Sequence, residues 1–343
     1  MQYLLNKLEL IRTASERNTF ILADARDADM AWGIPSFGVS SAADAGNAPA
    51  RSWCTVPMFL DQIRQVVHQG LIDILLASVS SMEVLAHRER LFEGTHITPA
   101  VRINDASDIW FLRGARYCDS PSRPFASAWI EEAQFGSLTA PRDQPPVVNL
   151  GLYSMTFNND LEADWRSLTA FREFRADAER RGFRYFLEVF APNVRDCGLT
   201  PSEIPDFVHD SIVRALAGIP SSGRPLFLKI PYFGPGPLEE LVAYDPSLVV
   251  GVMGGKSGTT HDAFRLLAEA RKYGARLALF GRKIKNAEDP LAFIRMLRAL
   301  ADGEIGPEEA VRCYHGELQS AGRKSKLPLE EDMQLTSSEL IHA

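Results

Sequence analysis

Four ionisable side chains lie inside or at the end of short apolar segments, where burial normally excludes charge. They are Asp24, Arg102, Glu188 and Lys229. Segments of this kind are typical of strands buried on both faces, which are nearly all apolar. A charge in such a strand needs either an ion-pair partner or a chemical role. These residues are therefore the first candidates for a functional site.

Lys229 is the most informative of them, because it interrupts the run Leu-Phe-Leu-Lys-Ile-Pro-Tyr at 226–232. Under a helix layer its ammonium would lack an evident partner, whereas near the open end of a strand it meets other polar groups. Burial favours the neutral amine of a lysine, which attacks carbonyl carbons. The iminium that results withdraws electrons, so that a neighbouring C–C bond can break or form. The position thus predicts a Schiff-base lysine; the alternative is an internal ion pair with Glu188 or Asp24.

Several other groups could move protons beside such a lysine. Asp24 and Glu188 could act during carbinolamine formation and dehydration, or take the proton from a substrate hydroxyl as the C–C bond breaks. Tyr153 and Tyr232 are alternative proton carriers. The sequence does not rank these groups, and either carboxylate could instead be a member of a structural ion pair. The predicted catalytic set is Lys229, Asp24, Glu188 and Tyr153.

Two glycine-containing turns could bind an anion. They are Gly254-Gly255-Lys256 and Gly281-Arg282, each of which follows an apolar run. Glycine allows close approach of the backbone to a phosphate, and Lys256 and Arg282 would add positive charge. We expect a phosphate monoester there, with Arg102 as a further anion-binding candidate; the alternative is that the glycines serve only tight turns. A nucleotide P-loop is disfavoured because three residues, not four, separate Gly251 from Gly255.

Short apolar runs alternate with amphipathic helical stretches along most of the chain, which is typical of a parallel sheet. Helices are expected near 56–67, 160–181, 203–218, 260–274 and 289–302 from apolar residues spaced three or four apart. Eight parallel strands close naturally into a barrel, so we predict the α/β class and a single (β/α)8 TIM-barrel domain over 1–343. The eight expected strands are 20–23, 72–76, 97–101, 147–152, 183–189, 226–230, 248–252 and 276–280.

Two connections are longer than a barrel turn requires. Residues 25–54 follow the first expected strand, and residues 104–146, which are rich in aromatics, follow the third. Active sites of such barrels lie where the strands end, so we expect both segments to form walls or a lid there. Packing of the second segment on a neighbouring subunit is the alternative. The charged tail, 318–343, is expected to be poorly ordered.

Composition narrows the classes of partner. The chain has 343 residues, 45% of them hydrophobic, and a formal net charge of −7, which provides no field that attracts nucleic acid or an anionic membrane. No signal peptide or membrane span is evident, so we expect a cytoplasmic protein. The four cysteines and seven histidines show no metal-binding spacing, and we expect neither a metal nor another cofactor.

The C-terminal half resembles the DhnA-type class I aldolases, which include archaeal-type fructose-bisphosphate aldolases. The resemblance rests on Lys229 in 228–232, on Gly254-Gly255, and on the stretch from Tyr-Gly-Ala at 273–275 to Phe-Gly-Arg at 280–282. It covers about 183–302 well and the first half loosely. It implies a Schiff-base lysine at Lys229, an acid/base Asp24, and phosphate contacts from Gly254, Gly255, Gly281 and Arg282. The chain departs from the family's Asp-His-Gly turn, since it has Asp-Ala-Arg-Asp at 24–27.

Three hypotheses follow. The first is a Schiff-base aldolase or transaldolase that acts on a phosphorylated sugar or related keto compound through Lys229. The second is a metal-independent phosphosugar isomerase or epimerase with Glu188 or Asp24 as its base. The third is a non-catalytic barrel that binds a sugar phosphate. Each would be a symmetric homo-oligomer by expectation.

Overall fold

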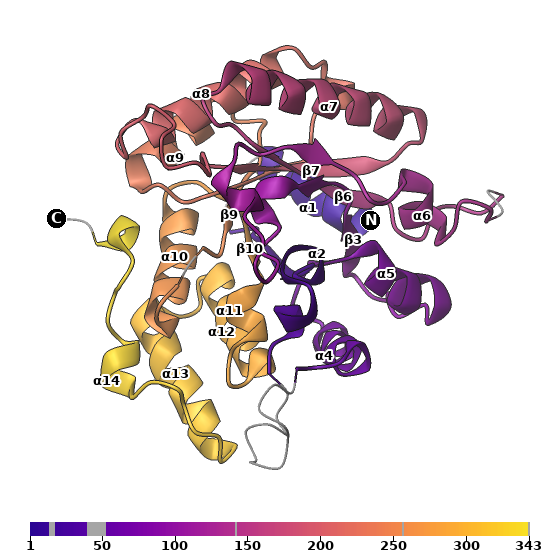
Figure 1. The fold of residues 1–343 in the computed structure, drawn as a ribbon. Helices are drawn as coiled ribbons and strands as arrows, with labels where there is room; N and C mark the ends of the chain where they lie inside the picture. Colours follow the sequence, from indigo (N-terminus) through magenta and orange to yellow (C-terminus); the bar gives the residue numbers. More distant parts are fainter. Residues whose placement is uncertain (14–17, 40–52, 141–142, 256, 342–343) are drawn as a thin grey trace.

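The computed structural model describes residues 1–13, 18–39, 53–140, 143–255 and 257–341. Its centre is a closed barrel of eight parallel strands, in the order β1-β10-β9-β8-β7-β6-β3-β2 (Figure 1). Each strand coincides with one of the eight expected runs, shifted by a few residues, so the predicted (β/α)8 fold is confirmed. The strands are β1 (Ile21–Arg26), β2 (Ile74–Ala77), β3 (Thr98–Arg102), β6 (Leu150–Thr156), β7 (Arg184–Phe190), β8 (Leu228–Ile230), β9 (Val250–Met253) and β10 (Leu277–Phe280).

Amphipathic helices surround the barrel. The ends of α4 show why they begin and stop where they do: the Thr55 hydroxyl accepts the Met58 N–H, and Gly70 ends the helix with φ 71°. Asp289 caps α12 in the same way, and Gly303 ends it with φ 78°. The five expected helices are all present, within a few residues. The helices that connect consecutive barrel strands, or follow the last one, are α4 (Val56–Gln69), α5 (Val79–Met82), α7 (Leu161–Arg180), α8 (Ile204–Ala217), α9 (Pro235–Tyr244), α10 (Thr260–Lys272), α11 (Arg282–Lys285) and α12 (Pro290–Asp302).

The hydrophobic core has an inner and an outer part, because side chains alternate along each strand. Inside the barrel, Phe186 and Phe227 stack with ring centroids 4.5 Å apart. Helix α1 (Gln2–Arg12) adds Leu4 and Leu8 to this inner cluster, and both are fully buried. The outer part, between strands and helices, includes Leu22, Tyr153 and Phe264. Only the alternate residues of each strand that point inward can bring a polar side chain to the interior of the barrel.

Both long connections fold back over the ends of the strands. The first contains α2 (Asp29–Trp32) and the 3-10 turn η1 (Ile34–Phe37); residues 40–52 of this segment lie outside the described residues. The Trp32 ring stacks on Phe111 of the second segment at 4.6 Å, so the two connections touch. The second contains η3 (Ser107–Ile109), η4 (Tyr117–Asp119), α6 (Ile130–Phe135), and a two-stranded antiparallel sheet of β4 (Asp105–Ala106) and β5 (Pro124–Phe125).

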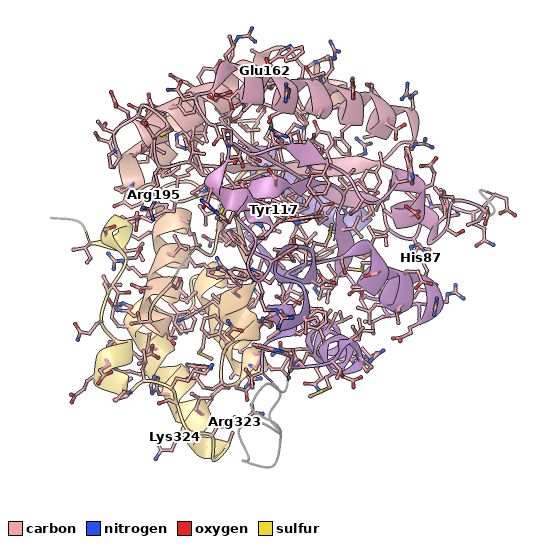
Figure 2. The ribbon with its side chains drawn as sticks, viewed as in Figure 1. His87, Tyr117, Glu162, Arg195, Arg323 and Lys324 are labelled. Carbon is pink, nitrogen blue, oxygen red and sulfur yellow. The ribbon has the colours of Figure 1, made fainter. Side chains whose placement is uncertain are left out.

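The second connection is fastened to the barrel by buried polar contacts. Asp108 accepts hydrogen bonds from Thr156 at the end of β6 and from Ser122, at 2.7 and 2.6 Å. Asn193, beyond β7, donates to the carbonyl oxygens of Cys118 and Ser120. Tyr117, within this segment, is half exposed (Figure 2). The segment therefore forms a wall beside the ends of β6 and β7.

The C-terminal residues correct one expectation from the sequence. Helix α13 (Pro307–Ser320) continues into α14 (Leu329–Asp332) and the turn η6 (Ser338–Leu340), and the described part of this tail packs along α10 (Figure 1). Two kinds of contact hold it: α13 buries the apolar stripe Ala310, Val311, Tyr314 and Leu318 in the outer core, and Asp262 and Asp332 bond backbone N–H groups across the contact between the tail and α10. The described residues also form a π-helix, η2 (Glu83–Arg88), a 3-10 turn, η5 (Ser221–Gly223), and an isolated antiparallel β-bridge between Val39 and Trp53. No helix among the described residues is long and apolar enough to cross a membrane.

Candidate active site

Three neighbouring strands place polar side chains in one row inside the barrel. In the strand register Ser154 of β6 is the partner of Glu188 of β7, and Glu188 is the partner of Lys229 of β8. All three side chains point into the barrel, because each lies two residues after an inward-facing residue of the same strand segment: Leu152, Phe186 and Phe227, respectively. Because parallel strands lie about 4.8 Å apart, side chains in one register row meet. The sequence predicted two members of this row, Glu188 and Lys229, but not Ser154.

Lys229 forms an ion pair with Glu188, and the two atoms that meet, Nζ and Oε1, are 2.5 Å apart. Their side chains are 8% and 2% exposed, respectively. Burial alone would raise the pKa of Glu188, but the positive charges of Lys229 and Arg102 outweigh it and lower that pKa to about 2. Glu188 is therefore a carboxylate over the physiological pH range. The internal ion pair weighed as an alternative from the sequence is present, and its partner is Glu188.

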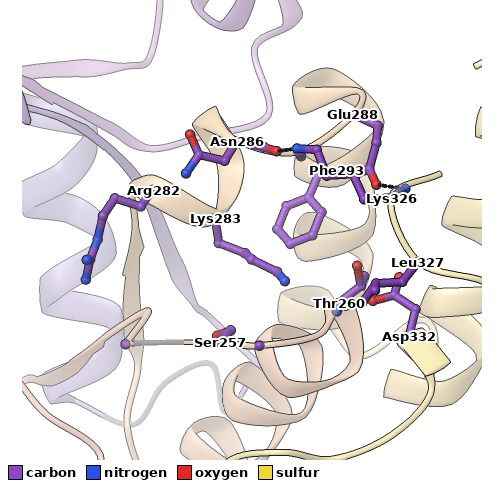
Figure 3. Close-up of a pocket in the computed structure, with 13 residues that line it drawn as sticks. Ser257, Thr260, Arg282, Lys283, Asn286, Glu288, Phe293, Lys326, Leu327 and Asp332 are labelled. Atoms are coloured by element: carbon purple, nitrogen blue, oxygen red, sulfur yellow. Dashed lines mark hydrogen bonds between the residues drawn. The ribbon is translucent and has the colours of Figure 1, made fainter. Parts of the chain in front are cut away.

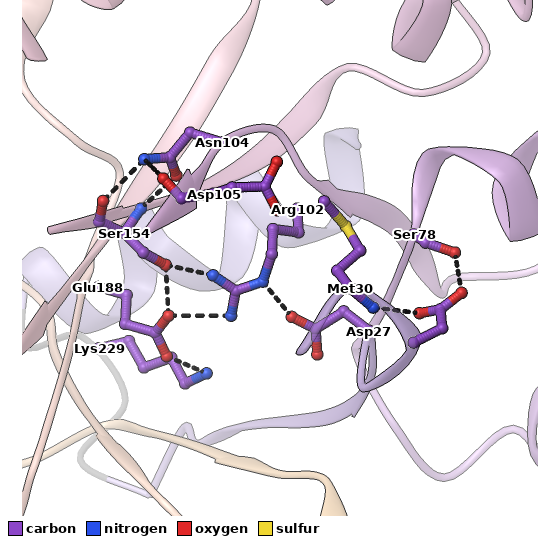
Figure 4. A network of polar contacts seen from close by, with 10 residues as sticks. Asp27, Met30, Ser78, Arg102, Asn104, Asp105, Ser154, Glu188 and Lys229 are labelled. Carbon is purple, nitrogen blue, oxygen red and sulfur yellow. Dashed lines mark hydrogen bonds and ion pairs between the residues drawn. The ribbon is translucent and has the colours of Figure 1, made fainter. Parts of the chain in front are cut away.

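Arg102, at the end of β3, joins this pair to the first connection (Figure 4). Its guanidinium donates to Glu188 Oε2 at 3.1 Å, to Ser154 Oγ at 2.6 Å and to Asp27 Oδ2 at 2.6 Å. Ser154 in turn donates to Glu188. Although burial opposes it, the two carboxylates raise the pKa of Arg102. Two cations and two carboxylates thus form one buried, charge-balanced network, in which Arg102 contacts protein carboxylates rather than standing free for a substrate phosphate.

Asp24 is not part of this network, which corrects the sequence-based assignment. It lies in the outer phase of β1, with Leu22 and Arg26, and its Oδ2 pairs with Arg26 Nε at 2.7 Å. Both side chains are 0% exposed, and burial raises the pKa of Asp24 despite the neighbouring guanidinium. Asp27, three residues further along the chain, is the carboxylate of this segment that contacts the network, through Arg102. Side chains alternate along a strand, so Asp27 is expected on the same face as Ile21 and Ala23, which point into the barrel. The sequence did not show which face of β1 points inward, because Asp24 and Arg26 make the other face polar as well.

Tyr153 and Tyr232 also face away from Lys229, for the same reason of alternation. The Tyr153 ring stacks on Phe174 of α7 at 4.4 Å, and burial raises its pKa. Tyr232 belongs to the outer core, and burial raises its pKa as well. Neither phenol reaches the Lys229 row. Since side chains alternate along a strand, a residue next to an inward-facing one points outward, towards the helices.

The two glycine turns lie side by side after β9 and β10, and packing explains part of their composition. A Cβ on Gly254 would lie 2.5 Å from the Phe280 ring, and one on Gly281 would lie 2.7 Å from the Ala25 carbonyl oxygen. The Gly254 N–H donates to Leu279 O at 2.8 Å, so it is already used. Gly255 has φ +56°, a conformation that favours glycine. The tight-packing interpretation thus accounts for Gly254, and Lys256 lies outside the described residues.

A cavity of about 540 Å³ opens beside these turns (Figure 3). Gly255 and the exposed Arg282 line it, together with residues of α12 and the C-terminal segment. Lys229 and the residues of its network do not line it. The cavity and the lysine row therefore share no residue, whereas residues of the turns after β9 and β10 line the cavity.

The C-terminal segment fixes the turn after β9. Asp262 of α10 accepts hydrogen bonds from the N–H groups of Gly258 and Thr259 and from Thr336 and Ser337 of the tail. Asp332 of the tail accepts the Thr260 N–H at 2.6 Å. The start of α10 is thereby held from both sides.

Among the described residues, no group of three His, Cys, Asp or Glu side chains could hold a metal ion. The Lys229 network offers two carboxylates, one hydroxyl and two cations.

Comparison with known proteins gives similarity at the level of structure. No family model matches the chain, and no curated protein matches it in sequence. A crystal structure of an archaeal fructose 1,6-bisphosphate aldolase aligns with a TM-score of 0.59 and 18% identity, over 87% of this chain and 99% of that one. The fructose-bisphosphate aldolase from Slackia heliotrinireducens aligns with a TM-score of 0.63 and 14% identity, over 91% and 89%.

The barrel is shared with these aldolases. A further archaeal fructose-1,6-bisphosphate aldolase, with a TM-score of 0.59 and 18% identity over 86% of this chain and 99% of that one, was solved with its catalytic lysine bound covalently to the carbinolamine intermediate. At this level of identity the similarity establishes the fold.

Proposed function

We propose that this chain is a class I aldolase that forms a Schiff base between Lys229 and a keto substrate. The observation that carries the proposal is the buried Lys229–Glu188 pair inside the barrel, within a row of polar side chains at the ends of the strands. That end carries the active sites of such barrels. The barrels of similar structure that act as aldolases support the same chemistry.

The proposed reaction conserves charge at Lys229. The ammonium gives up a proton, the amine nitrogen attacks the carbonyl carbon, and the carbonyl oxygen takes a proton to give a carbinolamine. Loss of that hydroxyl with a further proton, as water, leaves an iminium with the same +1 charge as the starting ammonium. Glu188 is the counter-ion of both, and a carboxylate whose pKa is about 2 holds that charge throughout.

Cleavage then needs a second proton carrier. A base takes the proton from the hydroxyl β to the imine carbon, the C–C bond electrons flow to the iminium to give an enamine, and an aldehyde leaves. The enamine takes a proton, and water releases the second product. We assign this role to Asp27, because Arg102 orients one of its oxygens and its side chain is 12% exposed. Capture of a different aldehyde by the enamine would be transaldolase-type transfer.

We assign the anionic end of the substrate to the turns after β9 and β10, with Gly255, Gly281 and Arg282 as contacts. Those turns are the frequent phosphate site of this fold. The exposed Arg282 is a cation next to them. A sugar phosphate or a related phosphorylated keto compound is therefore the substrate class we propose.

Turnover of the lysine variants tests the proposal against the other hypotheses. A panel of keto sugars and their phosphates is incubated with the protein, and products are detected by mass. Lys229→Arg and Lys229→Met should both abolish product formation, because neither side chain forms an imine. Turnover retained by Lys229→Arg would favour an isomerase or epimerase, which needs only the charge. Ligand-induced thermal stabilisation without product from the wild type would favour a non-catalytic binder.

A further inference from the structure

A row of large apolar side chains lies exposed along one face of α7. Leu161, Trp165 and Leu168 follow one another at spacings of four and three residues, so they share a face of the helix. They are 88%, 58% and 39% exposed, respectively. Phe171 and Ala178, on another face of the same helix, are buried in the outer core. The exposed row is thus additional to the face that packs on the barrel, and α7 lies at the edge of the molecule (Figure 1).

This α7 row borders a groove at the start of the helix, with a volume of about 430 Å³. The residues that line it are Asn159, Leu161, Asp164, Trp165 and Leu168. Hydrogen bonds hold its polar wall in place: the Asn159 side chain donates to Cys197 O at 2.9 Å, and Asp164 accepts the Asn158 N–H at 2.7 Å. The surface therefore offers a fixed hollow beside a protruding indole, and both belong to one patch.

Charges at the two ends of the row differ in sign. The first turn of α7 carries Glu162 and Asp164 after the capping Asp160, and Figure 2 shows Glu162 at the edge of the molecule. Glu162 pairs with Arg166 at 2.6 Å, whereas neither aspartate pairs with a cation among the described residues. Arg172, which continues the face of the row, is exposed and has no hydrogen-bond or ion-pair partner in the described part of the chain. Two aspartates thus lie at one end of the row, and an unpaired arginine lies at the other.

Two copies of this face fit each other when the helices run antiparallel. A two-fold axis brings the same patch of both subunits together, so that each contact occurs twice. With the axis midway between Trp165 and Leu168, the indole of each copy packs beside Leu168 of the second copy. Arg172 then lies opposite Leu161, beside the two aspartates of the second copy. A parallel pairing would instead set arginine against arginine and aspartate against aspartate, which is repulsive.

We propose that the α7 row is the interface of a homodimer, in which two copies of α7 pair antiparallel about a two-fold axis between Trp165 and Leu168. Burial of the row removes an apolar patch from water, and tryptophan often carries a large share of the binding energy of an interface. The charges at the ends of the row set the orientation of the two copies. Contact along one helix face is at the small end of the range of interfaces, so the dimer dissociates on dilution.

Sedimentation velocity of the full chain over a range of protein concentrations tests this interface. We expect the wild type to pass from monomer to dimer as the concentration rises. Trp165→Glu and Leu161→Lys change mostly exposed side chains, so both should fold as the wild type does, checked by circular dichroism, and remain monomeric. The matched control is Tyr244→Glu, which changes a 65% exposed aromatic residue of α9 outside the groove and should dimerise as the wild type does.

A charge reversal tests the orientation. Arg172→Glu should raise the dissociation constant of the dimer by about tenfold or more, because the change acts twice in a symmetric pair. A wild type that stays monomeric at every concentration, or a dimer retained by both Trp165→Glu and Leu161→Lys, would overturn the interface. Loss of the dimer in Tyr244→Glu as well would place the contact elsewhere, and an unchanged dissociation constant in Arg172→Glu would refute the antiparallel pairing. None of these outcomes depends on an imine at Lys229.

Discussion

Replacing Glu188 by glutamine should destabilise the fold and flatten its dependence on pH. The change keeps the shape of the side chain but removes the carboxylate shared by Lys229 and Arg102. Arg102 would then keep one counter-ion, Asp27, and the buried Lys229 would lose the carboxylate that it pairs with. Breaking one side of a buried ion pair typically costs about 3–5 kcal/mol, because the remaining charge loses its partner.

The pKa of Glu188 gives an independent magnitude. A shift from 4.5 to about 2 corresponds to about 3 kcal/mol of stabilisation of the charged form, at 1.36 kcal/mol per pH unit. Since the folded-state pKa is the lower one, this stabilisation is present above the unfolded-state value, near pH 4.5. It is lost as pH falls from there towards 2. Glu188→Gln should lack this contribution over the whole range.

Urea denaturation at pH 7 and at several values down to pH 3 measures both effects. We expect the free energy of unfolding of Glu188→Gln to fall by about 3 kcal/mol at pH 7, and its loss below pH 4.5 to be smaller than that of the wild type. Glu179→Gln on the exposed face of α7 is the control, expected within about 0.5 kcal/mol of the wild type. A Glu188→Gln protein with wild-type stability and the same acid dependence would refute the ion-pair reasoning.

Four other substitutions separate structure from chemistry. Asp24→Asn, which leaves Arg26 buried without its carboxylate, should lower the free energy of unfolding by about 3–5 kcal/mol in urea titrations, yet turnover per folded molecule should be unchanged. Asp27→Asn should instead affect mainly the turnover, with kcat reduced by about 10²–10⁴ in steady-state assays. Tyr153→Phe, whose ring faces α7, should keep wild-type kcat. Asp262→Ala should release the tail from α10, seen as faster proteolysis after residue 320 and about 1–3 kcal/mol of lost stability. Each opposite result would contradict the assigned contact.

The sequence was sufficient for the barrel and for part of the site. Eight apolar runs that mostly alternate with helical stretches predict eight strands. Charges inside or at the end of three of those runs mark Arg102, Glu188 and Lys229, which the structure brings together. The contacts follow from strand order, since Glu188 and Lys229 occupy one register row on neighbouring strands. Burial of charge is thus a signal that survives without any alignment.

The phase of a strand was harder to predict. In β1 both faces carry polar groups, since Asp24 and Arg26 neutralise each other against the helices while Asp27 turns inward. Composition cannot distinguish a polar pair that serves packing from one that serves a site. Ser154 gave no signal at all, because a serine in an apolar run is common. The tail was misjudged partly because Asp262 and Asp332 hold it through bonds that include backbone N–H groups far away in sequence, which composition does not reveal.

The central claim, an imine at Lys229, is tested most directly by trapping it. The wild-type protein is mixed with each compound of the keto-sugar and keto-sugar phosphate panel, reduced with borohydride and digested, and the peptides are identified by mass. We predict a covalent adduct, with the mass of the keto compound after loss of water and addition of two hydrogens, on the peptide that contains Lys229, and none in Lys229→Arg. An adduct confined to another lysine, or no adduct with any compound of the panel, would contradict the account.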